Sequence, residues 1–221
     1  MKVFVVIPAY NEETRIAQVL SKLAVLLYQV VVVDDASQDK TCEVVLKFPQ
    51  VVLLRHRLNR YQGAALETGN QYALKHGADI IVHFDADGQF LVADIAELIK
   101  PIIESDYQVV LGSRFLSKKS ELPRLKEYLF FPVARLVNYL FFNITTTDPQ
   151  SGFRAFSKDV ADKLHIEQDG MAHCSEILAK IFQHKLKVKE VPITVLYHHF
   201  GQNFGGGLKI IKDLLFSKIS K

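Results

Sequence analysis

Short apolar runs alternate with helix-like segments along the first half of this chain, and the alternation limits the folds that it can adopt. The apolar runs, which we interpret as strands, are residues 3–7, 30–33, 51–54, 80–82 and 109–111. Apolar side chains at helical spacing predict a helix at residues 12–27. Further helices are expected at 37–47, which residues 37–41 open, at 62–76, which Gly77 ends, and at 91–104. This order predicts an α/β fold: a doubly wound, mostly parallel sheet with helices on both faces.

The pattern changes after Ser113. Residues 122–145 are rich in Phe, Leu and Tyr and are expected to form one long helix, or two that break at Pro132. A loop then leads into a short strand within residues 148–156. The other expected elements are helices at residues 157–164, 175–184 and 208–219 and a strand at 188–191.

Composition and charge exclude several kinds of protein. With 221 residues, 49% hydrophobic and 23% charged, the chain can bury a substantial core and is not expected to be disordered. A net charge of +3 is too small to argue for nucleic acid, and suits a phosphorylated ligand or an anionic membrane surface equally well. Cys42 and Cys174 lie far apart and outside any CxxC motif, so we expect free thiols in a reducing compartment.

The N-terminal segment is too short for a signal peptide, because it runs directly into a Pro-Ala-Tyr-Asn turn. The longest apolar stretch, residues 130–144, is interrupted by Arg135 and Asn138 and falls short of the roughly 20 residues that a membrane span needs. We therefore expect a cytoplasmic protein that contacts a membrane only from its side.

Residues 83–89, His-Phe-Asp-Ala-Asp-Gly-Gln, follow the fourth expected strand and contain the strongest candidate site. In an extended strand end, residues two apart point the same way, so Asp85 and Asp87 can reach one point. Mg²⁺ and Mn²⁺ bind oxygen ligands, commonly one or two carboxylates together with substrate phosphates. Gly88 permits a sharp turn, and Gln89 supplies a further oxygen. The segment indicates a metal–diphosphate site at the strand ends, although an ordinary polar turn has the same composition.

Two other strand ends carry candidate binding residues. After the first strand, Pro8 forces an extended exit, Tyr10 offers an aromatic face for a base, and Glu12 suits a helix start. A helix cap at Asn11 would explain the acids but not the tyrosine. After the second strand, Asp35 stands where Rossmann-like folds hold a ribose or base. The dinucleotide motif GxGxxG and the P-loop motif are both missing after the first strand.

Together these stretches resemble the family 2 glycosyltransferases, inverting enzymes of the GT-A fold. The resemblance rests on Pro-Ala-Tyr-Asn-Glu-Glu at 8–13, Val-Asp-Asp-Ala-Ser-Gln-Asp-Lys-Thr at 33–41, Asn-Arg-Tyr-Gln-Gly-Ala-Ala at 59–65, Asp-Ala-Asp-Gly-Gln at 85–89 and Gly-Ser-Arg at 112–114. Asp-Pro-Gln-Ser-Gly-Phe-Arg-Ala-Phe at 148–156 resembles the dolichol-phosphate mannose synthase-like branch. Many members of that branch have Thr where this chain has Gln150, a change that we expect to tune the site without destroying it.

The resemblance implies a role for each matched segment. Residues 1–115 would be a nucleotide-sugar-binding half and residues 116–221 an acceptor-side half of one catalytic domain. The residues implied to hold the nucleoside of a GDP- or UDP-hexose are Pro8, Tyr10, Glu12 and Asp35. Asp85 and Asp87 would bind the donor diphosphate through Mg²⁺ or Mn²⁺, with Gln89 as a further ligand.

On the acceptor side, the resemblance assigns Arg154 to an acceptor phosphate, with Ser151 beside it. Arg114 follows a strand and could reach the donor phosphates, or could be an ordinary solvated arginine. With Asp87, these two arginines are the candidate catalytic residues. His199 lies in a Gly-rich loop, residues 197–207, which could close over a diphosphate or simply connect two elements.

The sequence therefore predicts a metal-dependent, inverting glycosyltransferase whose acceptor is a polyprenyl phosphate. A phosphate oxygen is already an anionic nucleophile at neutral pH, so no catalytic base is needed. A saccharide hydroxyl of a cell-surface polysaccharide would need one. Glu176 is the candidate base, although a polar residue in the first turn of a helix explains it as well. A nucleotidyltransferase and a non-catalytic nucleotide-sugar-binding protein also remain open at this point.

Two segments indicate contact with a membrane. Residues 122–145 mix aromatic and aliphatic side chains with basic ones, and residues 208–219 form a basic amphipathic pattern. Such helices lie in the plane of a bilayer interface, although they also pack on a protein's own sheet or on a dimer partner. We expect peripheral binding to the cytoplasmic face of a membrane, with a separate membrane anchor or a homodimer left open.

Overall fold

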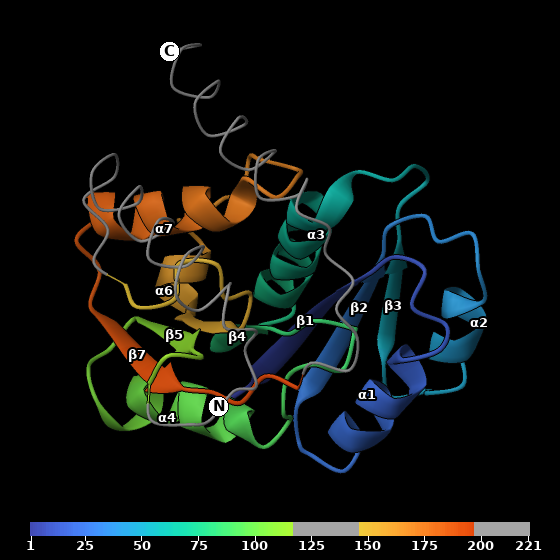
Figure 1. Cartoon of the computed structure of the whole chain (residues 1–221), viewed down its shortest axis with the longest axis horizontal. Coiled ribbons are helices and arrows are strands. Elements are labelled where there is room, and N and C mark those ends of the chain that lie inside the picture. Colours follow the sequence, from blue (N-terminus) through green and yellow to red (C-terminus); the bar gives the residue numbers. More distant parts are fainter. Residues whose placement is uncertain (117–145, 197–221) are drawn as a thin grey trace.

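The computed structural model describes residues 1–116 and 146–196 (Figure 1). In these ranges the strands form one seven-stranded sheet in the order β3-β2-β1-β4-β6-β5-β7. The strands are β1 (Val3–Ala9), β2 (Gln29–Asp34), β3 (Val52–Arg55), β4 (Ile80–His83), β5 (Val109–Ser113), β6 (Arg154–Ser157) and β7 (Val188–Pro192). All of the pairings that involve β6 are antiparallel, and the other pairings are parallel.

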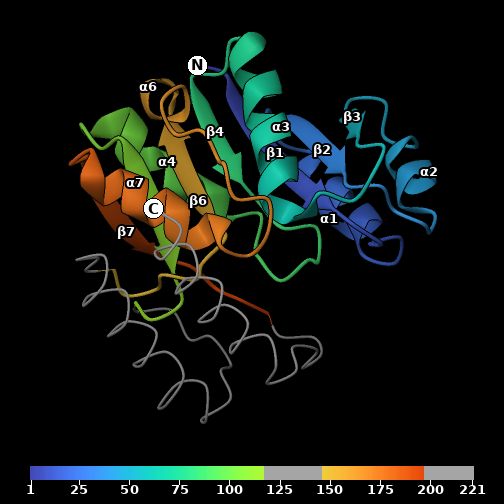
Figure 2. The same ribbon diagram turned by 90° about the horizontal axis from the view of Figure 1, so that it is seen from above.

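Helices cover both faces of this sheet, as Figure 2 shows from above. The helices are α1 (Ile16–Leu23), α2 (Thr41–Val45), α3 (Tyr61–Lys75), α4 (Asp94–Glu104), α6 (Lys158–Ala161) and α7 (His173–Gln183). Apolar residues of α1, α2 and α4 pack on one face, and those of α3, α6 and α7 on the other. The predicted doubly wound, mostly parallel α/β fold is therefore confirmed.

The strands of the sheet centre bury both of their faces. Along β1, Val5 and Ile7 belong to the core under α1 and α4, whereas Phe4 and Val6 belong to the core under α3 and α7. This explains why the strand is an unbroken apolar run in the sequence and does not alternate with polar residues.

The antiparallel strand β6 decides what meets at the functional edge of the sheet. It lies between β4 and β5, with Arg154 opposite His83 on one side and opposite Leu111 on the other. Because it runs against its neighbours, its first residue lies beside their carboxyl ends. The loop before β6 is thereby brought to the edge where parallel strands of open α/β sheets bind ligands.

The first helix begins later than its sequence pattern predicts. The pattern starts at Glu12, but α1 starts at Ile16. Asn11 has a φ of 56° and its side-chain oxygen accepts a hydrogen bond from the backbone N–H of Gln38 at 2.9 Å. Asn11 therefore joins two strand-end loops and does not cap α1, which corrects its interpretation as a helix cap.

Some predictions fall outside the described ranges. These are the long helix at 122–145, the Gly-rich loop at 197–207 with His199, and the tail helix at 208–219. Among the residues that are described, none of the helices is long and apolar enough to cross a membrane. The division at residues 115 and 116 stays a prediction, although β6 and β7 complete the same sheet as β1–β5.

Candidate active site at the carboxyl edge of the sheet

The two aspartates of residues 83–89 lie in a turn just beyond β4. The strand ends at His83, and the turn at Gly88 has a φ of 74°, in the left-handed region that favours glycine. Asp85 follows the strand closely and Asp87 stands in the turn, so the two aspartates do not both continue an extended strand end, which corrects the geometry expected from the sequence. The backbone N–H of Gln89 donates to Asp87 Oδ1 at 3.0 Å, which fixes that carboxylate across the turn.

Asp85 is held from two sides. Gln62 Nε2, at the start of α3, donates a hydrogen bond to Asp85 Oδ1 at 3.0 Å. On the other side, a Cβ at Gly152 would lie only 3.1 Å from Asp85 Oδ2, so the backbone of the loop before β6 packs directly on the carboxylate. The missing side chain of glycine leaves room for that approach.

The charge of this pair is costly without a cation. Burial raises the pKa of Asp85 to about 7, and the neighbouring Asp87 carboxylate adds to the rise. Burial and Asp87 likewise raise the pKa of Glu12, although Arg15 opposes them. The repulsion between carboxylates that share one partly buried place is relieved when a cation binds. The residues present therefore fit a divalent metal.

The protein shell for such a metal is sparse. Within the described ranges, no group of three or more His, Cys, Asp and Glu side chains converges on one point. This agrees with Mg²⁺-type chemistry, in which one or two carboxylates bind the ion and substrate phosphates and water complete its shell. Asp85, Asp87 and the amide oxygen of Gln89 are the residues of this turn that could contribute.

A second fixed carboxylate lies at the end of β2. Asp35 is 3% exposed, and its Oδ1 accepts hydrogen bonds from His56 Nδ1 at 2.7 Å and from the backbone N–H of Arg60 at 2.9 Å. Since α3 starts at Tyr61, one helix start connects the Asp35 and Asp85 carboxylates through Arg60 and Gln62. Both predicted donor-side carboxylates therefore share one edge and one supporting helix.

The end of β1 completes this edge. Pro8 lies within β1, opposite Val33 of β2, and Tyr10 beyond it is 43% exposed. The backbone N–H of Glu12 donates to Thr41 Oγ1 at 2.8 Å. An exposed aromatic ring at the edge that carries Asp35 is available to stack on a planar ligand.

Comparison with known proteins identifies the family. The family model "Glycosyl transferase family 2" matches residues 4–165. The chain belongs to this family. It is also 34% identical to UDP-N-acetylglucosamine–dolichyl-phosphate N-acetylglucosaminyltransferase of Methanococcus voltae, over 99% of this chain and 97% of that protein. Undecaprenyl-phosphate mannosyltransferase of Micrococcus luteus is 27% identical over 94% of this chain and 89% of its own length.

Solved structures agree on the fold. Glucosyl-3-phosphoglycerate synthase from Mycobacterium tuberculosis, crystallised with Mg²⁺ and uridine diphosphate, superimposes with a TM-score of 0.76 at 20% identity and covers 97% of this chain and 78% of that one. The fold is thus of the GT-A type. The predicted family, fold and enzyme class, a family 2 glycosyltransferase of the polyprenyl-phosphate branch, are confirmed.

In this glycosyltransferase, Arg114 is engaged within the protein. Its Nε lies 2.6 Å from Asp148 Oδ2 and its Nη2 lies 2.7 Å from Asp148 Oδ1, a two-point ion pair. Asp148 is 2% exposed. The structure therefore gives Arg114 a buried carboxylate partner, which neither the donor-phosphate interpretation nor the solvated one included.

The two acceptor-side candidates of the Ser-Gly-Phe-Arg segment are both buried. Arg154 is 1% exposed, and its Nη2 donates to the carbonyl oxygen of Ser151 at 2.7 Å. Among the described residues, Ser151 Oγ and Arg154 Nε and Nη1 have no hydrogen-bond partner. Unpartnered buried donors beside Asp85 are suited to an anion.

Glu176, the candidate base, has structural partners. Its Oε1 lies 2.7 Å from Lys180 Nζ, and its Oε2 accepts from the backbone N–H of Gln168 at 2.8 Å. These contacts tie the first turn of α7 to the preceding loop and favour the structural interpretation.

Several residues that support the site have no role in the prediction from sequence. Gln62 lies inside the segment 59–65 that carries the resemblance, and that segment could have indicated it. His56 directly follows β3, so the rule that ligand residues follow strands could have found it. Asp148 lies in the segment 148–156 that carries the resemblance, but nothing in that segment indicates its partner, because Arg114 stands 34 positions earlier.

Proposed function

We propose that this family 2 glycosyltransferase moves a hexose from a UDP- or GDP-sugar to a polyprenyl phosphate, depends on Mg²⁺ or Mn²⁺, and inverts the anomeric configuration. The observation that carries the proposal is the position of Asp85, which Gln62 and the Gly152 backbone hold beside Asp87 at the carboxyl edge of the sheet. The named relatives, which act on dolichyl and undecaprenyl phosphates, support the choice of acceptor.

The donor would lie along the edge between β2 and β4. Tyr10 would stack on the base and Asp35 would accept a hydrogen bond from the ribose, while Asp85, Asp87 and Gln89 would hold the cation. Bound there, a divalent cation supplies stabilisation for the negative charge that builds on the departing nucleoside diphosphate.

The reaction needs no base on the protein. An oxygen of the lipid phosphate attacks the anomeric carbon in line, a carbon–oxygen bond to the phosphate forms, and the bonding electrons to the donor leave with the diphosphate. No proton has to be removed. The engagement of Glu176 by Lys180 and by loop amides supports this acceptor over a saccharide hydroxyl. Ser151 and Arg154 would face the acceptor phosphate from the loop before β6.

The proposal includes peripheral membrane contact on the cytoplasmic face through residues 122–145 and 208–219, on the strength of their basic, apolar composition. Flotation with vesicles that contain anionic lipid tests it. We expect co-flotation that weakens as salt rises, and a protein that stays at the bottom of the gradient would contradict the membrane part.

Donor consumption by purified protein with Mn²⁺ tests the chemistry. UDP-N-acetylglucosamine, UDP-glucose and GDP-mannose would each be offered with and without a short polyprenyl phosphate. We expect one donor to be consumed only when the lipid is present, Asp87→Ala to be inactive, and Asp106→Ala, which changes an exposed aspartate, to be normal. Donor hydrolysis at the same rate with and without the lipid would refute the lipid acceptor, and saccharide acceptors would then be tested.

A further inference from the structure

Arg154 is a buried positive charge with very few partners. Its Nη2 contacts a carbonyl oxygen and Cys174 Sγ, the sulfur at 3.3 Å, and no carboxylate of the described residues forms an ion pair with it. A buried guanidinium is costly unless an opposite charge lies beside it. Before an acceptor phosphate binds, the neighbours of Arg154 must therefore supply that charge.

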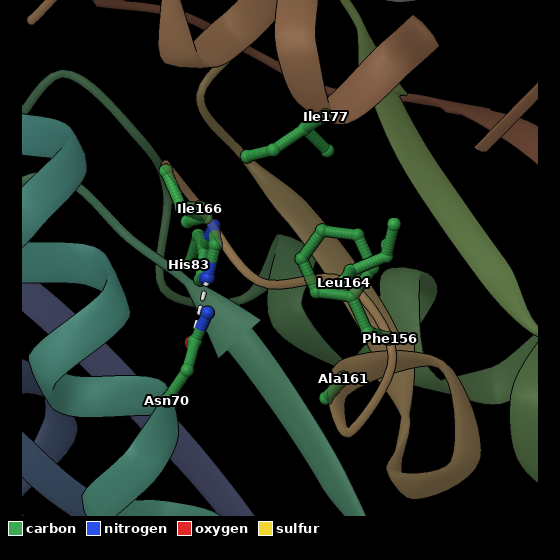
Figure 3. Close-up of a pocket in the computed structure, with 7 residues that line it drawn as sticks. All are labelled: Asn70, His83, Phe156, Ala161, Leu164, Ile166 and Ile177. Carbon is green, nitrogen blue, oxygen red and sulfur yellow. Dashed lines mark hydrogen bonds between the residues drawn. The ribbon is translucent and has the colours of Figure 1, made fainter. Parts of the chain in front are cut away.

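The neighbour on β4 does not supply a negative charge. His83 lies opposite Arg154 in the sheet, and its Nε2 contacts Asn70 Oδ1 at 2.9 Å. His83 and Asn70 line a cavity of about 10 Å³ whose other lining side chains are apolar. Their side chains face each other there (Figure 3). Burial and the charge of Arg154 lower the pKa of His83 well below its ordinary value, so this imidazole is neutral.

Cys174 lies on the other side, between two donors. Its Sγ is 3.3 Å from Arg154 Nη2 and 3.4 Å from His173 Nε2, and the residue is 5% exposed. His173 Nδ1 lies 2.8 Å from the carbonyl oxygen of Gly170, which can only accept, so Nδ1 carries a proton. A second proton on Nε2 would be donated to the sulfur, as the guanidinium proton is.

Building on the proposed function, we propose that Cys174 is a positioning residue: as a thiolate between His173 and Arg154, it is the counter-ion that keeps Arg154 from capturing the Asp85 carboxylate. The charges agree with this arrangement. Burial by itself would raise the pKa of Cys174, but His173 and Arg154 outweigh it and bring the pKa to about 6. Burial would lower the pKa of His173, and Cys174 raises it overall.

The consequence reaches the metal site through Asp85. A thiolate at Cys174 raises the pKa of Asp85, whereas His173 and Arg154 lower it and so favour the ionised carboxylate. Without the thiolate, Asp85 would become a counter-ion for Arg154, and a salt bridge between them would compete with a cation. Cys174 thus keeps a carboxylate available that the donor diphosphate needs.

Cys174→Ser tests the proposal, because it keeps the size and a hydrogen-bonding oxygen but stays neutral. Cys42→Ser is the matched control: burial and Asp34 raise the pKa of Cys42 to about 11, so that thiol is protonated. Two readouts suffice, the ultraviolet absorbance of thiolate in the metal-free protein at neutral pH, and Mn²⁺ affinity measured by electron paramagnetic resonance with UDP present. Thermal unfolding checks that each variant is folded.

We expect wild type and Cys42→Ser to show one thiolate and Cys174→Ser to show none. Mn²⁺ affinity should fall about tenfold in Cys174→Ser, the loss typical when a residue that supports a metal ligand is removed, and should not change in Cys42→Ser. Absence of a thiolate at Cys174, or unchanged Mn²⁺ affinity in a folded Cys174→Ser protein, would overturn the inference. Failure of wild type to bind Mn²⁺ in the presence of UDP would instead refute the proposed function. The thiolate absorbance is measured without metal, so it still tests the charge of Cys174 separately.

Discussion

Arg114 and Asp148 form a two-point ion pair that joins the end of β5 to the loop before β6. The Nε–Oδ2 distance is 2.6 Å and the Nη2–Oδ1 distance is 2.7 Å, and the backbone N–H of Arg114 also donates to Oδ2 at 3.1 Å. Next to it, Thr147 Oγ1 lies 2.6 Å from Ser113 Oγ. The pair therefore fixes where the chain re-enters the site before Ser151 and Gly152.

Asp148→Asn should destabilise the protein strongly. The Asp148 side chain is fully buried, and removing one partner of a buried ion pair costs about 3 kcal/mol or more. Urea unfolding should show a lower midpoint. The control is Glu104→Gln, whose partner Lys100 lies 3.9 Å away on an exposed helix face, and it should change the free energy of unfolding by less than about 0.5 kcal/mol. Equal effects of the two changes would contradict the structural role of Asp148.

Asp85→Asn should stabilise the metal-free protein at neutral pH. The pKa of Asp85 is raised to about 7, so between about pH 4 and that value the folded protein keeps a proton that the unfolded chain has lost. The free energy of unfolding of wild type therefore falls as pH rises through this window. The asparagine variant has no carboxyl group to ionise at this position and does not lose this stability. We expect its free energy of unfolding to exceed that of wild type by about 1–3 kcal/mol near pH 8 and to equal it near pH 4.

Thermal unfolding at the two pH values measures this difference. Added Mn²⁺ should raise the melting temperature of wild type near pH 8 more than that of Asp85→Asn. A melting-temperature difference between the two proteins that is the same at both pH values would show that the Asp85 carboxylate is not perturbed.

Gly152→Ala should weaken metal binding. The new Cβ would lie 3.1 Å from Asp85 Oδ2 and 3.4 Å from Oδ1, so either the loop or the carboxylate has to move. We expect Mn²⁺ affinity in the presence of UDP to fall about tenfold, a change of about 1.4 kcal/mol. Gly170→Ala is the control, because nothing lies within 4 Å of its new Cβ. Similar Mn²⁺ affinities for the two alanine variants would rule out the close approach at Gly152.

Gln62→Met should lower both metal affinity and turnover, because it removes the hydrogen bond that orients Asp85 while keeping the length of the side chain. Removing a residue that orients a metal ligand typically lowers metal affinity or activity about 10-fold or more, and we expect a loss of about that size in both. Gln71→Met, on the same helix, removes only exposed contacts with Glu67 and His165 and should behave as wild type. Isothermal titration with Mn²⁺ and UDP would compare them, and equal affinities would remove Gln62 from the site.

Much of the fold could be predicted because its signals are local. Each buried parallel strand is an apolar run, and Gly77 marks the end of the helix before it, so β1–β5 and α3 fall close to their predicted positions. The start of α1 was predicted too early because Asn11 takes part in a contact with Gln38, and hydrophobic spacing does not register such contacts.

The candidate site was predictable where one segment contains its own chemistry. Asp85, Asp87 and Gln89 stand within five consecutive residues, and Asp35 directly follows a strand, so chain order alone indicated a ligand-binding edge. Nothing local distinguishes Arg114 with a buried partner from Arg114 in solvent, and its pairing with Asp148 depends on the antiparallel direction of β6.

The sequence by itself determined the α/β fold class, the family and the acidic turn after β4, because these depend on residue types and spacings within short stretches of chain. Only the tertiary structure decided that Gly152 packs on Asp85, that Arg154 is buried, and that Cys174 lies between Arg154 and His173. The contacts of Gly152 with Asp85 and of Arg154 with Cys174 join segments that are distant in the chain, and they arise when the insertion of β6 between β4 and β5 brings α7 and the loop before β6 onto one edge. Burial and charge follow from that assembly, since both depend on what surrounds a side chain in space.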